Sequence, residues 1–447
     1  MYICKQNHFT RHFMRKIILS ICFLTLTFYS GAQLLTSNKG KMYNNFTGID
    51  YVFVFNGITA SNEIITYNGT LTSDSVINWE KFDGTVVANQ SYFSPENNTG
   101  YLAKVNGKVK ATCWVIDYQK YLPILTSIEP ENNPTAQCQE LKLFINANVP
   151  LISYTPYASI NPIIIPREFS INYQTLKWNE AKTVWLPLDT ISPVILPITQ
   201  KTIPTPYCNT IFKLKGDQFA TDLNLSPDTV SSSLYITNAV ICKATSVVTI
   251  RDAKNEAERP SQATQLNGSA PLDIQFLSNA NEPVAQFYNW TIYKGTDLII
   301  NRKDKDHRYT FADAGTYRVK VTASNSYCSY SDSLTVTVSE SRLQIPNVFT
   351  PNGDGFNDEF RVAYKSIVKF QCWVYNRWGR QVYYWTDPTK GWDGKINGVD
   401  AKPGAYFYVI KAYGSDFDPN SKPNSTTHER AGEYIKKGDI NLLRGVQ

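Results

Sequence analysis

The chain has 447 residues, too many for one hydrophobic core and enough for three or four domains of ~100–200 residues. Hydrophobic residues make up 42%, aromatic residues 13% and charged residues only 18%, which excludes wholesale disorder and favours β-structure. The net charge is +6, but residues 1–32 hold four basic and no acidic side chains. Removing those four from 44 leaves 40 basic against 38 acidic residues, a net +2, which argues against nucleic-acid binding through a basic face.

The first 32 residues have the pattern of a secretory signal peptide. Arg15 and Lys16 precede the mostly apolar run Ile17–Phe28, and small residues lead to a cleavage site after Ala32, leaving Gln33 first. A membrane anchor is the alternative, but twelve apolar residues are too few to span ~30 Å of hydrocarbon. No later run of 18 apolar residues occurs, so we expect an exported chain without an integral membrane segment.

The remaining chain is expected to form all-β modules. In the first, at 33–143, strand-like runs recur and a Pro- and Asn-rich stretch around 129–134 suggests a boundary. A Pro-rich β module follows at 144–252, where the two prolines of Ile160–Pro166 permit only edge or linker backbone. The charged segment Arg251–Pro260 is expected to be a short linker or helix. The expected strands up to this point are Tyr51–Phe55, Val76–Trp79, Tyr101–Val105 and Thr112–Ile116.

An internal repeat supports this modular reading. The pattern N-W-x-x-aromatic-x-G-T occurs at 78–85 and again at 289–296, and a Gly-led strand follows each copy. A strand tryptophan with such a partner strand is typical of the centre of an immunoglobulin-like sandwich. Trp79 and Trp290 are therefore expected in sandwich cores, with ligand-stacking platforms as the alternative.

The third module, 253–342, carries a family resemblance. Its expected strands are Leu272–Phe276, Gln286–Tyr293, Thr316–Ala323 and Ser333–Val338. The segments Tyr288-Asn289-Trp290, Ala314-Gly315-Thr316-Tyr317 and 319–325 resemble the PKD-like repeats of bacterial surface proteins, although no FGDG-like turn follows the tryptophan. The resemblance implies a spacer or adhesion module. The expected fold is thus tandem immunoglobulin-like or PKD-like β-sandwiches.

The last module, 343–447, holds four motifs in order. They are PNVFTPNGDGFND at 346–358, NRWGR at 376–380, GWDGK at 391–395 and KPGAYFYVIKA at 402–412. Gly353 and Gly355 suit the positive φ of a tight loop, whose Asn and Asp side chains can bond nearby backbone. Strands are expected at Phe370–Tyr375, Gln381–Trp385, Ala405–Tyr413 and Asp439–Leu443, with a long polar loop over 416–430 before the last of them.

This ordered set closely resembles the gliding motility-associated C-terminal domain, the type B sorting domain of the type IX secretion system of Bacteroidota. The resemblance implies a β-sandwich sorting domain, export across both membranes, and the translocon with its outer-membrane barrel shuttle as partner. It assigns recognition to the motif residues Asn347, Phe349, Pro351, Asn352, Gly353, Asp354, Gly355, Asn376, Arg377, Trp378, Gly379, Trp392, Asp393, Gly394, Gly404 and Tyr406.

Two side-chain roles in this module stay open. Asn352, Asp354, Asn357 and Asp358 place oxygen ligands closely, as Ca²⁺ prefers, or they bond their own backbone in Asx turns. No other cofactor is expected. Arg377 can meet a carboxylate of a partner, or it can stack on Trp378 or Trp392.

The cysteines are consistent with export. Six cysteines remain after the signal peptide, an even number that favours disulfides. Sequence proximity suggests the pairs Cys113–Cys138 and Cys208–Cys242, which leaves Cys328 and Cys372 to pair across a domain boundary or to stay buried thiols.

Four sites fit the short D-[S/T]-hydrophobic pattern of Bacteroidota O-glycosylation. Their acceptor residues are Ser75, Thr190, Thr229 and Ser333.

Catalytic motifs are missing from the sequence. HExxH, GxSxG, Walker A and GxGxxG do not occur, and beyond the leader only His307 and His428 remain, in different modules. A glycosidase that uses a pair of catalytic carboxylates has no local sequence motif, so the motif search does not test for it. We therefore expect a non-enzymatic protein, secreted or at the cell surface, that binds other surface or gliding proteins. The alternatives are a persistent component of the translocon or gliding machinery, and a cargo that binds or hydrolyses surface glycans.

Overall fold

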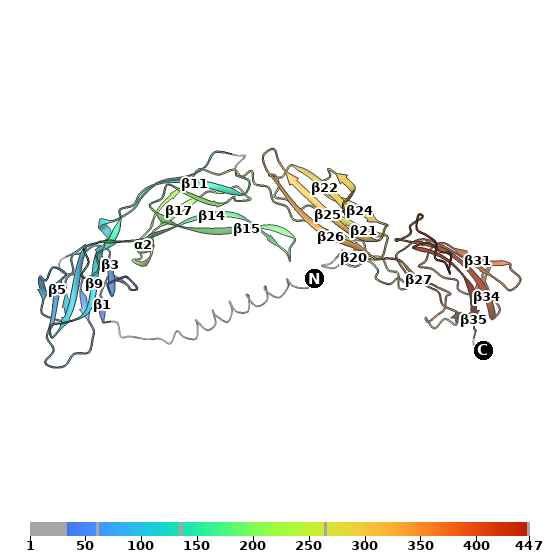
Figure 1. Ribbon diagram of the computed structural model, residues 1–447, viewed down its shortest axis with the longest axis horizontal. Helices are drawn as coiled ribbons and strands as arrows, with labels where there is room; N and C mark the ends of the chain where they lie inside the picture. Colours follow the sequence, from blue (N-terminus) through green and yellow to red (C-terminus); the bar gives the residue numbers. More distant parts are fainter. Residues whose placement is uncertain (1–33, 60–61, 134–136, 263–265, 445–447) are drawn as a thin grey trace.

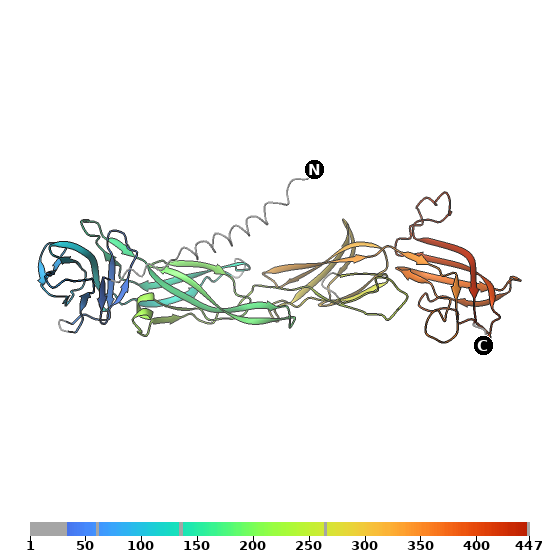
Figure 2. The same ribbon diagram turned by 90° about the horizontal axis from the view of Figure 1, so that it is seen from below.

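Four β-rich modules follow one another in an extended row, curved in one view and straight in the other (Figures 1 and 2). This computed structural model describes residues 34–59, 62–133, 137–262 and 266–444. The signal peptide and the cleavage site at Ala32 and Gln33 lie outside the described residues. Within those ranges, no helix is both long and apolar enough to cross a membrane.

The first module packs a six-stranded sheet, ordered β2-β3-β9-β8-β5-β6, on a three-stranded sheet, β1-β4-β7. Side chains from both sheets form one core around Trp79, which is 0% exposed. Its elements are β1 (Leu35–Ser37), β2 (Lys41–Tyr43), β3 (Tyr51–Phe55), β4 (Ile65–Tyr67), β5 (Ile77–Lys81), β6 (Val86–Ala88), β7 (Tyr92–Phe93), β8 (Thr99–Val105), β9 (Lys108–Asp117) and the 3-10 helix η1 (Tyr118–Lys120).

The second module packs β10-β11-β16 on β15-β14-β17-β18, with β12 and β13 as a separate pair. The prediction for Ile160–Pro166 is confirmed, because within the described part of the chain β13 pairs with β12 alone. The elements are β10 (Ile124–Pro130), β11 (Glu140–Asn148), β12 (Ile152–Tyr154), β13 (Ile163–Ile165), β14 (Arg167–Asn179), β15 (Val184–Leu196), β16 (Gln200–Pro204), β17 (Lys213–Gly216), α2 (Gln218–Asp222) and β18 (Asp228–Ser231).

The third module packs β19-β21-β24 on β20-β26-β25-β22-β23 around Trp290, also 0% exposed. Trp79 and Trp290 are therefore core residues, and the platform alternative is wrong for both. The strands are β19 (Thr245–Val248), β20 (Leu266–Gly268), β21 (Leu272–Leu277), β22 (Phe287–Lys294), β23 (Asp297–Arg302), β24 (His307–Phe311), β25 (Gly315–Ser324) and β26 (Ser329–Val338).

The fourth module is built on the sheet β28-β35-β34-β30-β31 around the buried Trp392. Its last strand begins at Glu433, six residues before the predicted start, and pairs with β34 without a break. The strands are β27 (Arg342–Gln344), β28 (Val348–Phe349), β29 (Ala363–Lys365), β30 (Ile367–Tyr375), β31 (Gln381–Trp385), β32 (Lys395–Ile396), β33 (Val399–Asp400), β34 (Gly404–Gly414) and β35 (Glu433–Leu442).

Two module boundaries differ from the expected 143/144 and 252/253. Strands β10 and β11 form a sheet with β16, so they belong to the second module. Strand β19 pairs with β21, so the third module begins before residue 245. The Pro- and Asn-rich stretch around 129–134 begins in β10, which ends at Pro130 and pairs with β11 of the same sheet, so it does not mark a domain boundary. Turn-forming residues occur between paired strands as readily as between domains.

The first junction, between modules one and two, is a shared core. Apolar side chains of β3 and β9 form one buried cluster with those of β12, β13 and α2. Beside it Arg167 donates from Nε to Asp217 Oδ2 at 2.6 Å, and both side chains are at most 2% exposed. Tyr118 of the first module donates to the other oxygen of Asp217 at 2.8 Å, so the ion pair ties the two modules together.

The second junction, between modules two and three, holds a disulfide. Cys138 bonds to Cys328, 190 residues away. Nearby, Trp185 of the long β14–β15 ribbon donates its indole N–H to the carbonyl of Asn279 at 2.6 Å. The buried Asn281 donates to the carbonyls of Tyr207 and Ala239, both at 2.8 Å. A covalent bond and polar contacts therefore fix this junction.

Candidate functional site

The loop after β28 is closed by its own carboxylates. Asp358 accepts hydrogen bonds from the backbone N–H groups of Asn352, Gly353 and Gly355 at 2.7–3.0 Å. These bonds, chiefly the one from Gly353, lower the pKa of Asp358. Asp354 accepts from the N–H of Phe356 at 2.8 Å. As predicted, Gly353 and Gly355 have positive φ, at 82° and 85°.

This loop therefore adopts the self-bonded alternative for Asn352, Asp354 and Asp358. Asn352 also donates its side-chain amide to Asp354 at 2.8 Å. Asn357 sits at a φ of 50°, and its carbonyl accepts from Thr350 N–H. Within the described ranges, no group of three or more His, Cys, Asp and Glu side chains is arranged to hold a metal ion. The loop leaves Phe356 at its tip, 76% exposed.

The turn between β30 and β31 presents a second exposed aromatic side chain. The side-chain oxygen of Asn376 accepts from the N–H groups of Trp378 and Arg380, both at 3.0 Å, and Gly379 takes the positive φ of 78°. Trp378 is 76% exposed. The guanidinium of Arg377 lies 4.6 Å from the centre of the Trp378 ring, the first of its two expected stacking partners. The stack stiffens the turn and keeps a cation beside the indole.

A groove of about 490 Å³ runs beside this turn. Its lining includes the apolar side chains of Ile396, Ala405 and Phe407 and the charged side chains of Arg377, Asp400 and Lys402. Phe407 is exposed, as is Val399. The groove thus combines apolar side chains and the exposed Trp378 with two cations and the carboxylate of Asp400, a mixture suited to binding another protein.

Other predicted motif residues point inward. Phe349, Trp392 and Tyr406 are buried and their rings are in contact, with Trp392 lying 5.4 Å from Phe349 and 4.9 Å from Tyr406. Asp393 accepts from Lys395 N–H at 3.0 Å. The remaining turn glycines, Gly394 and Gly404, have positive φ, and the carbonyl of Asn347 accepts from Asn441. The structure thus separates the motif residues into a core set and an exposed set.

Arg444 is a residue that the motifs did not reveal. It donates to the carbonyls of Pro351 and Gly394, at 3.3 and 3.0 Å, and forms an ion pair with Asp400 at 3.2 Å. It therefore holds the first motif loop against the third motif turn. No local pattern marks it, because its partners, two backbone carbonyls and the Asp400 carboxylate, lie far away in sequence.

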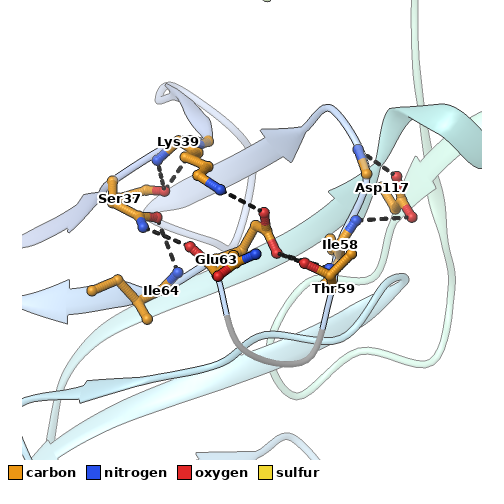
Figure 3. Close-up of polar contacts among 11 residues, drawn as sticks. Ser37, Lys39, Ile58, Thr59, Glu63, Ile64 and Asp117 are labelled. Atoms are coloured by element: carbon orange, nitrogen blue, oxygen red, sulfur yellow. Dashed lines mark hydrogen bonds and ion pairs between the residues drawn. The ribbon is translucent and has the colours of Figure 1, made fainter.

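At the other end of the row, two acidic side chains fasten the loop after β3 (Figure 3). Glu63 is 6% exposed, accepts from the N–H and hydroxyl of Thr59 at 2.8 and 2.9 Å, and pairs with Lys39 at 3.2 Å. The backbone bond from Thr59 is the main cause of the lowered pKa of Glu63. Asp117 accepts from the N–H groups of Gly57 and Ile58. Both carboxylates therefore accept hydrogen bonds from this loop, and Glu63 also pairs with Lys39.

The predicted disulfide pairs are wrong. Cys138 bonds to Cys328 and not to Cys113, while Cys208 and Cys242 are free. Burial raises the pKa of Cys208, and it raises that of Cys242 to about 11. Cys372 is a buried free thiol, which was one of its two expected states.

The four glycosylation candidates lie on the surface or near it. Thr229 and Ser333 are exposed, and Ser75 and Thr190 are half-buried. Three of them lie in β strands, and Ser75 lies just before β5. Whether sugars are attached there stays a prediction.

Two family models match the chain. Residues 343–426 match the CHU_C Type IX secretion signal domain, and residues 130–232 match a Fibronectin type III domain. No curated protein matches. The chain therefore carries a type IX secretion signal domain at residues 343–426, behind immunoglobulin-like β-sandwich modules, and this signal indicates export through that secretion system. The resemblance of 269–338 to PKD repeats stays a prediction.

Similar solved structures are multi-domain chains. The FN1–FN3 domains of chicken CNTN1 share 11% identity, with 71% of this chain and 98% of that chain covered and a TM-score of 0.24. Immunoglobulin domains 1–5 of Sidekick-1 share 12%, with 91% and 81% covered and a TM-score of 0.22. Three N-terminal domains of the outer capsid protein Hoc of bacteriophage RB49 share 9%, with 73% and 99% covered and a TM-score of 0.20. At such low TM-scores, these likenesses carry no further argument.

Proposed function

We propose that the exported protein is a non-enzymatic, stiff spacer at the cell surface of a Bacteroidota bacterium. The observation that carries this proposal is the row of modules joined by a shared core at one junction and a disulfide at the next (Figure 1). Modules joined by flexible linkers would move freely relative to one another, whereas these junctions oppose such motion. The spacer holds its first module far from the end that carries the secretion signal.

The absence of catalysis is part of the same proposal. The buried tryptophans of modules one and three lie in cores. Each of the four acids buried among the described residues already has protein partners: Glu63 and Asp117 accept hydrogen bonds from the loop after β3, Asp217 pairs with Arg167, and Glu256 pairs with Arg251. His307 and His428 lie in different modules. These observations favour a binding or spacing role over a carboxylate-pair glycosidase.

We further propose that the groove beside Trp378 is where the barrel shuttle of the translocon binds during export. The exposed motif residues Arg377 and Trp378 line this groove, whereas the exposed first motif loop does not. An exposed aromatic ring with a stacked arginine is the type of anchor that dominates protein interfaces. A Trp378→Ala variant should therefore reach the surface several-fold less and accumulate in the periplasm.

The measurement is the surface-exposed fraction of tagged full-length protein in its native host. Phe287→Ala is the matched control, because Phe287 is another exposed aromatic residue, 58% exposed, at the start of β22. Equal surface amounts for Trp378→Ala and the wild type would rule out this groove as the recognition surface.

The same tagged strain separates the two alternatives. Co-purification with the translocon at constant stoichiometry would favour a permanent component of the machinery. Release of the free protein into the medium would contradict that alternative. The glycan alternative is favoured by the 13% aromatic content, and silence on a glycan array would count against it.

A further inference from the structure

The third and fourth modules are joined by more than their connector. The segment Arg251–Pro260, expected to be a linker or helix, instead contacts the fourth module through residues 255–258. Ala257 N–H donates to the carbonyl of Tyr364 at 2.8 Å, and Tyr364 N–H donates to Asn255 at 3.1 Å. The side-chain amide of Asn255 donates to the carbonyls of Val362 and Pro388, at 2.8 and 2.7 Å. One asparagine therefore holds two separate segments of the signal domain.

A pair of serines forms the centre of this third junction. Ser269 of module three and Ser366 of module four are both 0% exposed. Ser366 N–H donates to the hydroxyl oxygen of Ser269 at 2.6 Å, and Ala270 N–H donates to the hydroxyl oxygen of Ser366 at 3.0 Å. Buried hydroxyl and N–H groups are costly when unpaired. Separating the modules would break both bonds, so the two surfaces are matched to each other.

A third set of contacts surrounds the connector. The carbonyl of Ser415 accepts from Ala314 N–H at 2.7 Å, and the hydroxyl of Ser415 donates to the carbonyl of Ser339 at 2.8 Å. Lys365 pairs with Glu258 at 3.1 Å across the junction. The connector, Ser339–Ser341, is three residues long between β26 and β27, and Ser341 N–H donates to Asp416 at 3.0 Å.

From these contacts we propose that the type IX signal domain is a permanent structural partner of module three and stays on the protein after export. Removal of a signal by a protease needs an accessible, flexible linker. Here the connector is short and bonded, and the module surfaces on both sides bury complementary polar groups. The proposal is independent of which surface binds the translocon, so retention and recognition can fail separately.

The first test uses protein collected from the surface of the native host. Peptides from 343–444 should be recovered in the same molar amount as peptides from 266–338, measured against isotope-labelled standards. Surface protein that lacks the C-terminal peptides while keeping those of module three would overturn the proposal.

The second test measures access to the connector in purified full-length protein. Glutamyl endopeptidase should cut after Glu340 far more slowly than after Glu180, which is exposed in the β14–β15 turn. The variant Asn255→Ala removes the two hydrogen bonds that the side-chain amide donates to module four. It should therefore speed cutting after Glu340 by about tenfold. The exposed-serine control Ser329→Ala should leave it unchanged. Wild-type cutting after Glu340 as fast as after Glu180 would contradict a closed junction.

Discussion

The first and second junctions both restrict movement between neighbouring modules, but they do so through different interactions. The first excludes water with apolar side chains and encloses a single ion pair, Arg167–Asp217. The second relies on the Cys138–Cys328 bond and on asparagine and tryptophan hydrogen bonds. A shared core forms wherever the chain folds, whereas a disulfide requires an oxidising compartment. The second junction is therefore the one whose stiffness depends on export.

Asp217→Ala should have the largest effect, because it leaves the Arg167 guanidinium buried without its counter-ion. It also removes the acceptor of Tyr118 and of the Ala220 N–H at the start of α2. The expected local destabilisation is about 3–5 kcal/mol, measured by hydrogen exchange over α2 and β14.

Asp252→Ala is the control for that variant. Asp252 forms an exposed pair with Arg259 at 3.3 Å, and such pairs are worth about 0–1 kcal/mol. If Asp217→Ala changed exchange no more than Asp252→Ala, the first junction would not depend on its ion pair.

Cys138→Ser combined with Cys328→Ser should have the next largest effect. Loss of this cross-link is expected to cost about 2–4 kcal/mol. The remaining hydrogen bonds at the junction hold it more loosely, so small-angle scattering should show a broader distribution of molecular lengths. The expected contrast is that reduction loosens the second junction and leaves the first unchanged.

Cys208→Ser is the matched control, because Cys208 is a free, half-buried thiol. It should scatter like the oxidised wild type. Identical scattering of the disulfide-free protein and the wild type would mean that the hydrogen bonds of Trp185 and Asn281 are enough to fix the second junction.

The sequence predicted the local features of this molecule better than its long-range ones. Tyr51–Phe55 and Gln381–Trp385 are strands with the expected bounds, because alternating apolar residues and flanking turns are local signals. The disulfide was missed because Cys138 and Cys328 meet only through the packing of two modules. Nearness in sequence, which suggested Cys113–Cys138, carries no information on such contacts.

The candidate site shows the same division. The sequence motifs named Trp378 and Trp392 alike, yet one is exposed and the other buried. A sequence motif shows which residue type occupies a position. Whether that side chain is buried in the core or exposed to a partner follows only from the packing of the folded chain. The charged stretch Arg251–Pro260 resembled a linker because its backbone partners, such as the carbonyl of Tyr364, lie more than 100 residues away.

The smallest effect is expected from an ion pair that contrasts with Arg167–Asp217. Asp273 of β21 pairs with Arg308 of β24, whose side chain is 61% exposed. The hydrogen bond from Arg308, together with those from Thr249 and Thr310, lowers the pKa of Asp273 to about 2. Because solvent screens the arginine, Asp273→Asn should cost only about 1 kcal/mol or less at neutral pH.

The pH dependence of this pair gives the sharper readout. A carboxyl whose pKa is lower in the folded state stabilises the fold above its unfolded pKa of about 3.9. That stabilisation is lost as the pH falls through about 4 towards 2. The difference between wild type and Asp273→Asn in hydrogen exchange over β21 should therefore be constant from neutral pH to about pH 5 and shrink below pH 4. A difference that grew on acidification would reverse the sign required by the lowered pKa.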